Sequence, residues 1–135
     1  MGVPATLLRK LYVTGSLRNT PTGFQFQLKN RLAPATLLRF GGLKVDGRYI
    51  ATERVYLHVN DDVYPASHID VHRPVLFQVN HILTVIVEGE TLSPGSHHLT
   101  CDLYAQEVGW LHIPIEDELR EFLPTSVDVS QMALS

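Results

Sequence analysis

Residues 99–115, LTCDLYAQEVGWLHIPI, decide the fold class. Apolar and polar side chains alternate through both halves of this stretch, and the segment that joins the halves contains Gly109. A two-residue period is typical of β-strands with one buried face, and a glycine-containing joint between two such runs indicates a hairpin. The stretch therefore predicts two antiparallel strands.

The register of this hairpin follows from keeping the apolar residues together on one face. We predict a three-residue loop over residues 107–109, in which Gly109 supplies the left-handed backbone conformation. A two-residue loop would set Gln106 against Leu111 and is rejected on that ground. The predicted inward pairs are Ala105 with Leu111, Leu103 with Ile113, and Cys101 with Ile115.

The outward face of the same hairpin carries Tyr104, Trp110 and His112, with Asp102 and Gln106 beside them. In the predicted register Tyr104 lies opposite His112, and Trp110 lies opposite Gln106. Exposed aromatic side chains gathered on one face are typical of a contact site, for a protein or for a sugar ring. Cover by a second sheet or by the C-terminal tail is an equal alternative.

Alternation extends to the rest of the chain. Strands are expected within residues 11–17, 24–28, 35–45, 48–50, 55–59 and 82–87, the last as a central strand covered on both faces. The turn at residues 20–23 sets Leu17 opposite Phe26 and Asn19 opposite Phe24. About eight short strands joined by turns predict an all-β fold, an antiparallel β-sandwich of the jelly-roll or immunoglobulin-like kind.

We expect one domain over residues 1–135, with a core at about 7–116 and a C-terminal tail over 117–135. The acidic run at residues 116–118 would begin a short helix, because carboxylates favour the positive end of a helix dipole. One or two helical turns are expected there from apolar residues at helical spacing and the proline that follows, namely Leu119, Phe122, Leu123 and Pro124.

Composition limits the partners and the compartment. The net charge is −3 and the basic residues are scattered, so nucleic acid is not expected as a partner. No apolar run approaches the ~18 residues that span a membrane, and the N-terminus lacks the features of a signal peptide. The only cysteine, Cys101, allows no internal disulfide. We therefore expect a cytoplasmic protein without membrane association.

No set of catalytic or metal-ligating residues is evident in the sequence. Among seven histidines, His68 and His72 have the spacing of a helical zinc pair, but prolines surround them and no third ligand stands at a usable spacing. Cys101 lies on an inward face, as a small core residue would. Nucleophile-elbow and phosphate-loop motifs are missing as well. We therefore expect no cofactor or metal in this chain.

Two stretches carry a resemblance to a known family. Residues 10–34, KLYVTGSLRNTPTGFQFQLKNRLAP, and residues 74–99, which include VIVEGETLSPGSH, resemble the small, or β, subunit of bacterial C-glycoside deglycosidases. The resemblance implies a β-sandwich subunit that pairs with a larger, TIM-barrel, sugar-isomerase-like α subunit in a hetero-oligomer. That α subunit would hold a divalent metal, expected to be Mn²⁺, and the complex would cleave the carbon–carbon bond of 3-oxo-C-glycosides by elimination.

The leading hypothesis from the sequence is thus an accessory β subunit of a carbon–carbon lyase that is inactive alone. Tyr104, Trp110 and His112 are its candidate partner or substrate surface, and His97 joins them because the resembling family has a histidine at that position. The alternatives are a free-standing carbohydrate-binding or adaptor module and, third, a small metal-dependent enzyme that acts alone.

Overall fold

A computed structural model describes residues 2–120 of the chain. Strands dominate it, with one short α-helix and three 3-10 turns. The elements are α1 (Ala5–Leu8), η1 (Arg9–Leu11), β1 (Arg18–Asn19), β2 (Gly23–Lys29), β3 (Ala35–Val45), β4 (Arg48–Ile50), η2 (Thr52–Arg54), β5 (Val55–Val59), β6 (Asp62–Pro65), η3 (Ala66–His68), β7 (Val75–Phe77), β8 (Ile82–Glu88), β9 (Gly95–Ala105) and β10 (Gly109–Leu119).

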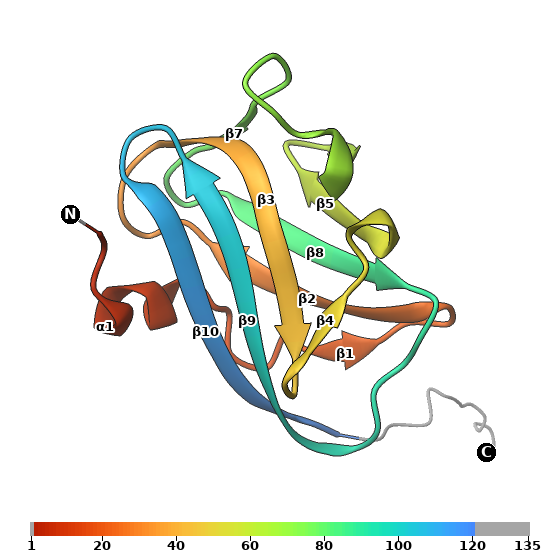
Figure 1. The fold of residues 1–135 in the computed structure, drawn as a ribbon. Helices are drawn as coiled ribbons and strands as arrows, with labels where there is room; N and C mark the ends of the chain where they lie inside the picture. The colour runs from red at the N-terminus through yellow and green to blue at the C-terminus, as the bar shows by residue number, and fades with distance from the viewer. Residues whose placement is uncertain (1, 121–135) are drawn as a thin grey trace, which may run out of the picture.

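The strands form two antiparallel sheets. Sheet A has the order β1-β2-β8-β5-β6, and sheet B has the order β10-β9-β3-β4, with β7 paired to the beginning of β3. In Figure 1, β10, β9 and β3 run side by side in front of β8 and β2, which cross behind them. The predicted antiparallel sandwich is confirmed. Its strands number ten because β1, β6 and β7 have only two to four residues, too few to show alternation in the sequence.

The core lies between the two sheets and follows the two-residue period. In β2 and β8, the inward side chains Phe24, Phe26, Leu28, Leu83, Val85 and Val87 are all fully buried. The strand β8 is central in sheet A, as predicted, but its outward face is covered only in part, because Thr84 there is buried whereas Ile82 is 44% exposed. Burial of apolar surface is the main stabilising contribution to such a fold.

The β9–β10 hairpin has the predicted faces in a different register. Leu103 pairs with Leu111, Cys101 with Ile113 and Leu99 with Ile115, two residues away from the predicted pairing. The loop therefore consists of residues 106–108, and Gly109 is the first residue of β10, where its φ of 85° turns the chain into the strand. The predicted pairs of Leu103 with Ile113 and Tyr104 with His112 are wrong.

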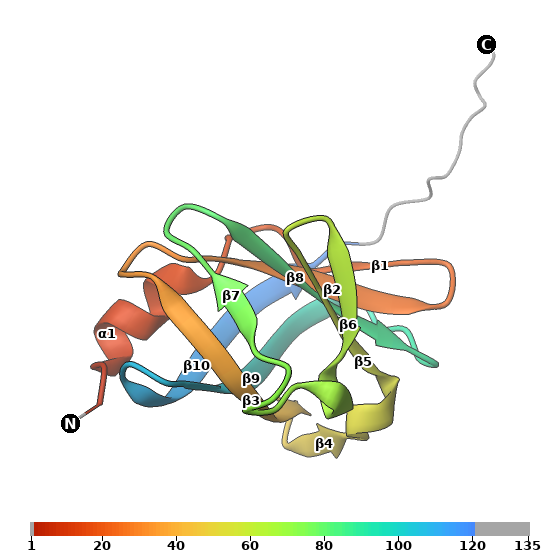
Figure 2. The ribbon, with the colours of Figure 1, turned by 90° about the horizontal axis from the view of Figure 1, so that it is seen from above.

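The predicted strand over residues 11–17 is wrong, because Leu11 ends a helical segment and residues 13–17 form a turn and irregular chain before β1. Residues 5–11 form α1 and η1, and Leu8 and Leu11 are buried at helical spacing. Figure 2 shows α1 beside the sandwich at the edge formed by β10. The chain then reaches β1, whose Asn19 pairs with Phe24 as predicted. None of the helices within residues 2–120 is long and apolar enough to cross a membrane.

At the other end, β10 continues through Leu119, so the predicted helix at residues 116–119 is wrong. Asp117 lies on the inward side of the strand, where its carboxylate accepts hydrogen bonds from the Tyr12 hydroxyl at 2.5 Å and from the Gly15 N–H at 2.8 Å. Leu119 is buried just beyond it. These distant partners let an acidic residue face inward. Phe122, Leu123 and Pro124 lie outside the described residues.

Candidate functional site

The outward face of sheet B gathers the aromatic residues that the sequence singled out. Trp110 of β10 pairs with Tyr104 of β9, and His112 pairs with Asp102. The Tyr104 and Trp110 rings meet edge to face with centroids 5.2 Å apart, and the His112 ring lies nearly parallel to Trp110 at 6.0 Å. Trp110 is 39% exposed, so this ring cluster is neither buried in the core nor covered by another described element.

Gly41 positions the tryptophan. The pairing of β3 with β9 shifts between Phe40 and Gly42, which marks a β-bulge at Gly41. A Cβ atom at Gly41 would lie 2.4 Å from the six-membered ring of Trp110. Only a glycine at this position lets the indole lie this close to β3. The indole ring in turn covers the β3 backbone at Gly41, which has no side chain of its own to shield it.

A hollow lies beside the tryptophan. It has a volume of about 300 Å³ and is lined by Leu38, Arg39, Val71, Tyr104 and Trp110. Val71 is 64% exposed, and Arg39 is exposed as well. We call these five residues, together with Asp102 and His112, the aromatic surface. It joins β3, β9 and β10 to the segment between η3 and β7.

The polar part of the aromatic surface is an oriented pair. Nδ1 of His112 lies 2.8 Å from Oδ1 of Asp102, and the imidazole is mostly exposed. The Asp102 carboxylate accepts a hydrogen bond from Nδ1–H, so in the neutral ring Nε2 is left as a hydrogen-bond acceptor facing solvent. The surface thus combines apolar rings with a guanidinium and an outward-facing imidazole nitrogen, a composition typical of the anchoring part of a protein interface.

His97 does not belong to this surface. Its side chain points inward from β9, is 6% exposed, and bonds at both ring nitrogens. Nδ1 lies 2.6 Å from Oδ2 of Asp46 in the β3–β4 turn, and Nε2 lies 2.7 Å from the carbonyl oxygen of Ser93. Burial alone would lower the pKa of His97, but these two acceptors outweigh it and raise the pKa above 6.5. His97 therefore links the segment before β9 to the β3–β4 turn.

The ion pair of His97 and Asp46 predicts a pH dependence of stability. The folded pKa of His97 is raised, so its contribution is complete below about pH 6.5 and is lost as the pH rises through the folded value. The pKa of Asp46 is lowered, first by the N–H of His98 and then by His97, so its contribution is lost only in acid, below about 3.8. The pair therefore stabilises the fold most at mildly acidic pH.

We expect urea unfolding to show a loss of about 1 kcal/mol between about pH 6 and pH 9, the size of one net hydrogen bond. The His97→Gln variant should lose most of this dependence, because an amide does not titrate. His112→Gln is the matched control and should keep it. An equal pH dependence in wild type and His97→Gln would show that other groups cause it.

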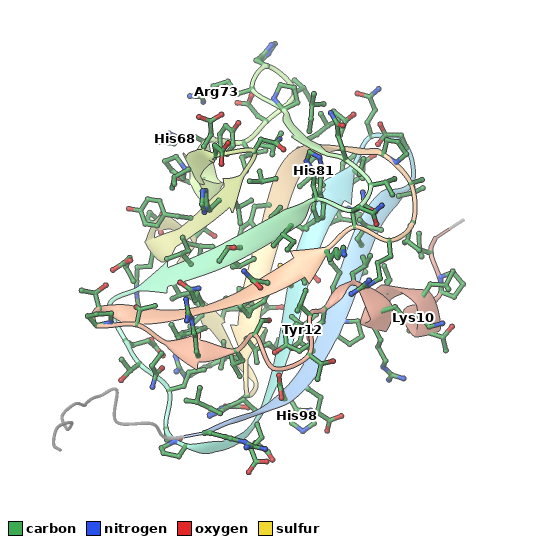
Figure 3. All side chains as sticks on the ribbon, turned by 180° about the vertical axis from the view of Figure 1, so that it is seen from behind. Lys10, Tyr12, His68, Arg73, His81 and His98 are labelled. Atoms are coloured by element: carbon green, nitrogen blue, oxygen red, sulfur yellow. The ribbon has the colours of Figure 1, made fainter. Side chains whose placement is uncertain are left out.

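The remaining histidines and the cysteine form no reactive centre in the described part of the chain. His68 ends η3 and His72 lies in the turn that follows, so they do not share a helix face. Figure 3 shows His68, His81 and His98 at separate places on the molecule. Within residues 2–120 no three His, Cys, Asp or Glu side chains cluster so as to hold a metal ion. Cys101 is fully buried, which raises the pKa of its thiol.

Sequence reasoning found Tyr104, Trp110, Asp102 and His112 on one outward face, because period-two alternation assigns faces directly. It missed the residues that come from other elements, namely Leu38, Arg39, Gly41 and Val71. The paired glycines in β3 were a usable signal, since a bulge without side chains leaves room for a ring from a neighbouring strand. Val71 follows η3 on a segment without alternation, and no pattern pointed to it.

Fold and surface together define an all-β sandwich domain with an exposed cluster of aromatic side chains on sheet B. The chain belongs to the family described as hydroxymethylglutaryl-CoA reductase, N-terminal domain, whose family model matches residues 7–120. No curated protein matches the chain.

The family match corrects the resemblance to C-glycoside deglycosidase β subunits, which is wrong, and with it the assignment to carbon–carbon bond cleavage. The stretches that carried the resemblance, residues 10–34 and 74–99, contain core strands and turns of the sandwich and no catalytic signature. Such patterns recur in unrelated sandwiches. The sugar-isomerase-like partner and its Mn²⁺ were implied by that resemblance alone and stay predictions.

Proposed function

We propose that this chain is a non-catalytic docking domain, and that the aromatic surface attaches it to the polypeptide that carries hydroxymethylglutaryl-CoA reductase chemistry. The family description supports the association with that reductase. The observation that carries the docking role is Trp110, which stays 39% exposed on the outward face of sheet B although its ring is already fixed against Gly41 and Tyr104. An aromatic ring that is already held in one orientation loses little conformational entropy when a partner covers it.

The charged groups of the described residues support a structural role. Glu90 pairs with both Arg48 and Arg54, joining the segment after β8 to β4 and η2. Asp117 is held by Tyr12, and Asp46 by His97. Reduction of a thioester requires a bound hydride donor and a group that polarises the carbonyl, and the proposal assigns both to the partner. As part of the same proposal we place the domain in the cytoplasm, where the free thiol of Cys101 is stable.

The docking proposal predicts a specific loss of association. Trp110→Ala should weaken binding to the catalytic reductase polypeptide of the same organism by about 2 kcal/mol or more, roughly 30-fold in Kd, because buried tryptophans often dominate interface energy. Calorimetry or surface binding measures the Kd, and urea unfolding of the isolated chain should change much less. Gly41→Ala should also weaken binding, since its methyl group displaces the indole.

The matched control is Tyr56→Ala, which removes an aromatic side chain from the outward face of sheet A. It should leave the Kd within about twofold of wild type. If Trp110→Ala lowers the unfolding free energy but leaves the Kd unchanged, the tryptophan serves only to cover the β3 bulge and the docking proposal fails.

A second expected result concerns activity. The purified chain alone, given hydroxymethylglutaryl-CoA and a reduced nicotinamide cofactor, should show no turnover, because the proposal assigns hydride transfer to the partner. Oxidation of the cofactor is followed by absorbance, with heat-denatured chain as the blank. Turnover by the isolated chain, abolished by denaturation, would contradict the non-catalytic role.

A further inference from the structure

A second concave site lies at one end of the sandwich, apart from the aromatic surface. A cavity of about 100 Å³ opens where the β9–β10 loop, the segment before β3 and the N-terminal residues meet. Leu103, Leu111 and Ile113 form its floor from the inward faces of β9 and β10, while Tyr104 and Trp110 point outward from the same strands. Leu11 and Phe77 close its sides.

The two polar side chains of the wall are already hydrogen-bonded within the protein. Of the residues that line the cavity, only Asn30 and Glu107 are polar. The Asn30 amide nitrogen donates to the carbonyl oxygens of Ala33 and Phe77 at 2.8 and 2.7 Å, and its oxygen accepts from the Leu32 N–H at 3.0 Å. The Glu107 carboxylate is held by the N–H and hydroxyl of Thr36 at 2.9 and 2.8 Å.

The charge of Glu107 at the mouth of the cavity further restricts which ligands can bind. The N–H of Thr36, and then its hydroxyl, lower the pKa of Glu107, so this group is an anion at neutral pH and disfavours an anionic guest. Lys10 and Arg31 flank lining residues in the sequence but do not line the cavity themselves. The exposed apolar side chains Leu32 and Val108 continue the apolar wall to the surface.

Protein interiors rarely contain empty spaces much larger than a water molecule, and an apolar cavity of ~150 Å³ binds a benzene ring. A space of about 100 Å³ with an open mouth therefore fits a branched aliphatic group or a small ring. We propose that this cavity is a binding site for a small molecule that presents a neutral apolar group of that size. The site is independent of the docking proposal, since it uses the opposite faces of β9 and β10.

The probe for this site is benzene, with benzoate as the charged control of the same ring size. Benzene at about ten times its Kd should raise the Tm of the full chain by roughly 3–5 °C and shift the methyl NMR resonances of Leu103, Leu111 and Ile113. Benzoate should do neither, because the cavity offers no partner for its charge. An unchanged set of methyl resonances in benzene would overturn the proposal.

A variant whose cavity is filled by a larger side chain tests whether benzene binds at this site. Ala35 lines the cavity, so Ala35→Leu should abolish both the Tm rise and the methyl shifts, whereas Ala51→Leu, at an exposed position outside it, should retain them. If Ala35→Leu does not fold, Ala33→Leu at the mouth provides the same comparison. Benzene effects that persist in a folded, filled variant would mean that benzene binds elsewhere, and the assignment would be wrong.

Discussion

Replacing Phe26 with alanine is expected to lower the free energy of unfolding by about 3–5 kcal/mol. The Phe26 ring is fully buried, pairs across the sheet with Val85, and lies 6.4 Å from the Tyr12 ring. Its removal forfeits the transfer free energy of the ring and leaves a space that neighbouring side chains from two sheets fill only in part. Because small domains are stable by about 5–15 kcal/mol, this loss should bring the chain close to unfolding.

Urea unfolding followed by circular dichroism measures this loss. The matched control is Gln25→Ala, one residue away on the outward face of the same strand, where a change of less than about 0.5 kcal/mol is expected. Similar losses from both variants would mean that the alternation of faces along β2 is wrong, and with it the placement of sheet A.

The second large effect is expected at Gly23, the first residue of β2. A Cβ atom there would lie 1.8 Å from the carbonyl oxygen of Val87, which belongs to the paired strand β8. The obstacle is backbone, so no side-chain rotation relieves the overlap, and the two strands must separate locally. Gly23→Ala should therefore cost about 3 kcal/mol or more, at the upper end of overpacking changes.

Thermal unfolding of Gly23→Ala beside Gly2→Ala provides the comparison, since a methyl group at Gly2 meets no atom within 4 Å. We expect a Tm loss of roughly 10 °C or more for the first variant and almost none for the second. A Gly23→Ala protein as stable as wild type would show that β2 and β8 do not approach so closely at this end.

The fold class was predictable from the sequence because alternation assigns residues to faces, and faces define a sandwich. The register of the β9–β10 hairpin was not, and the reason is geometric. A shift of two residues leaves each inward side chain inward, so Leu103 finds an apolar partner in Leu111 as readily as in Ile113. Only the backbone geometry of the turn, with Gly109 at positive φ in the strand, decides between the two registers.

At both ends of the described residues, the sequence did not predict the elements that form. Asp117 interrupts the apolar alternation of β10 and so suggested the end of the strand. Its carboxylate is satisfied by Tyr12, which lies 105 positions earlier in the chain, and by the Gly15 N–H. The segment before Tyr12 offered Leu8 and Leu11 at helical spacing, but so short a run is ambiguous between helix and strand.

The candidate surface was predictable in part for the same reason. Tyr104, Trp110 and His112 come from two strands that adjoin in sequence, so alternation brought them to one face. Arg39 and Val71 come from elements far away in the chain, and their arrival beside Trp110 depends on how β3 and the segment after η3 pack. His97 was assigned to the surface by resemblance alone, and its odd-numbered position on β9 places it on the inward face with Cys101.

The buried thiol of Cys101 can be used to measure how often the core of this protein opens. It is the only cysteine in the chain, it is fully buried between the sheets, and burial raises the pKa of its thiol. A thiol reagent reacts with the thiolate, so labelling must wait for the sandwich to open and expose the sulfur. The labelling rate under native conditions therefore measures how often the core opens. A partner that binds only the closed sandwich would lower this labelling rate without contacting the cysteine.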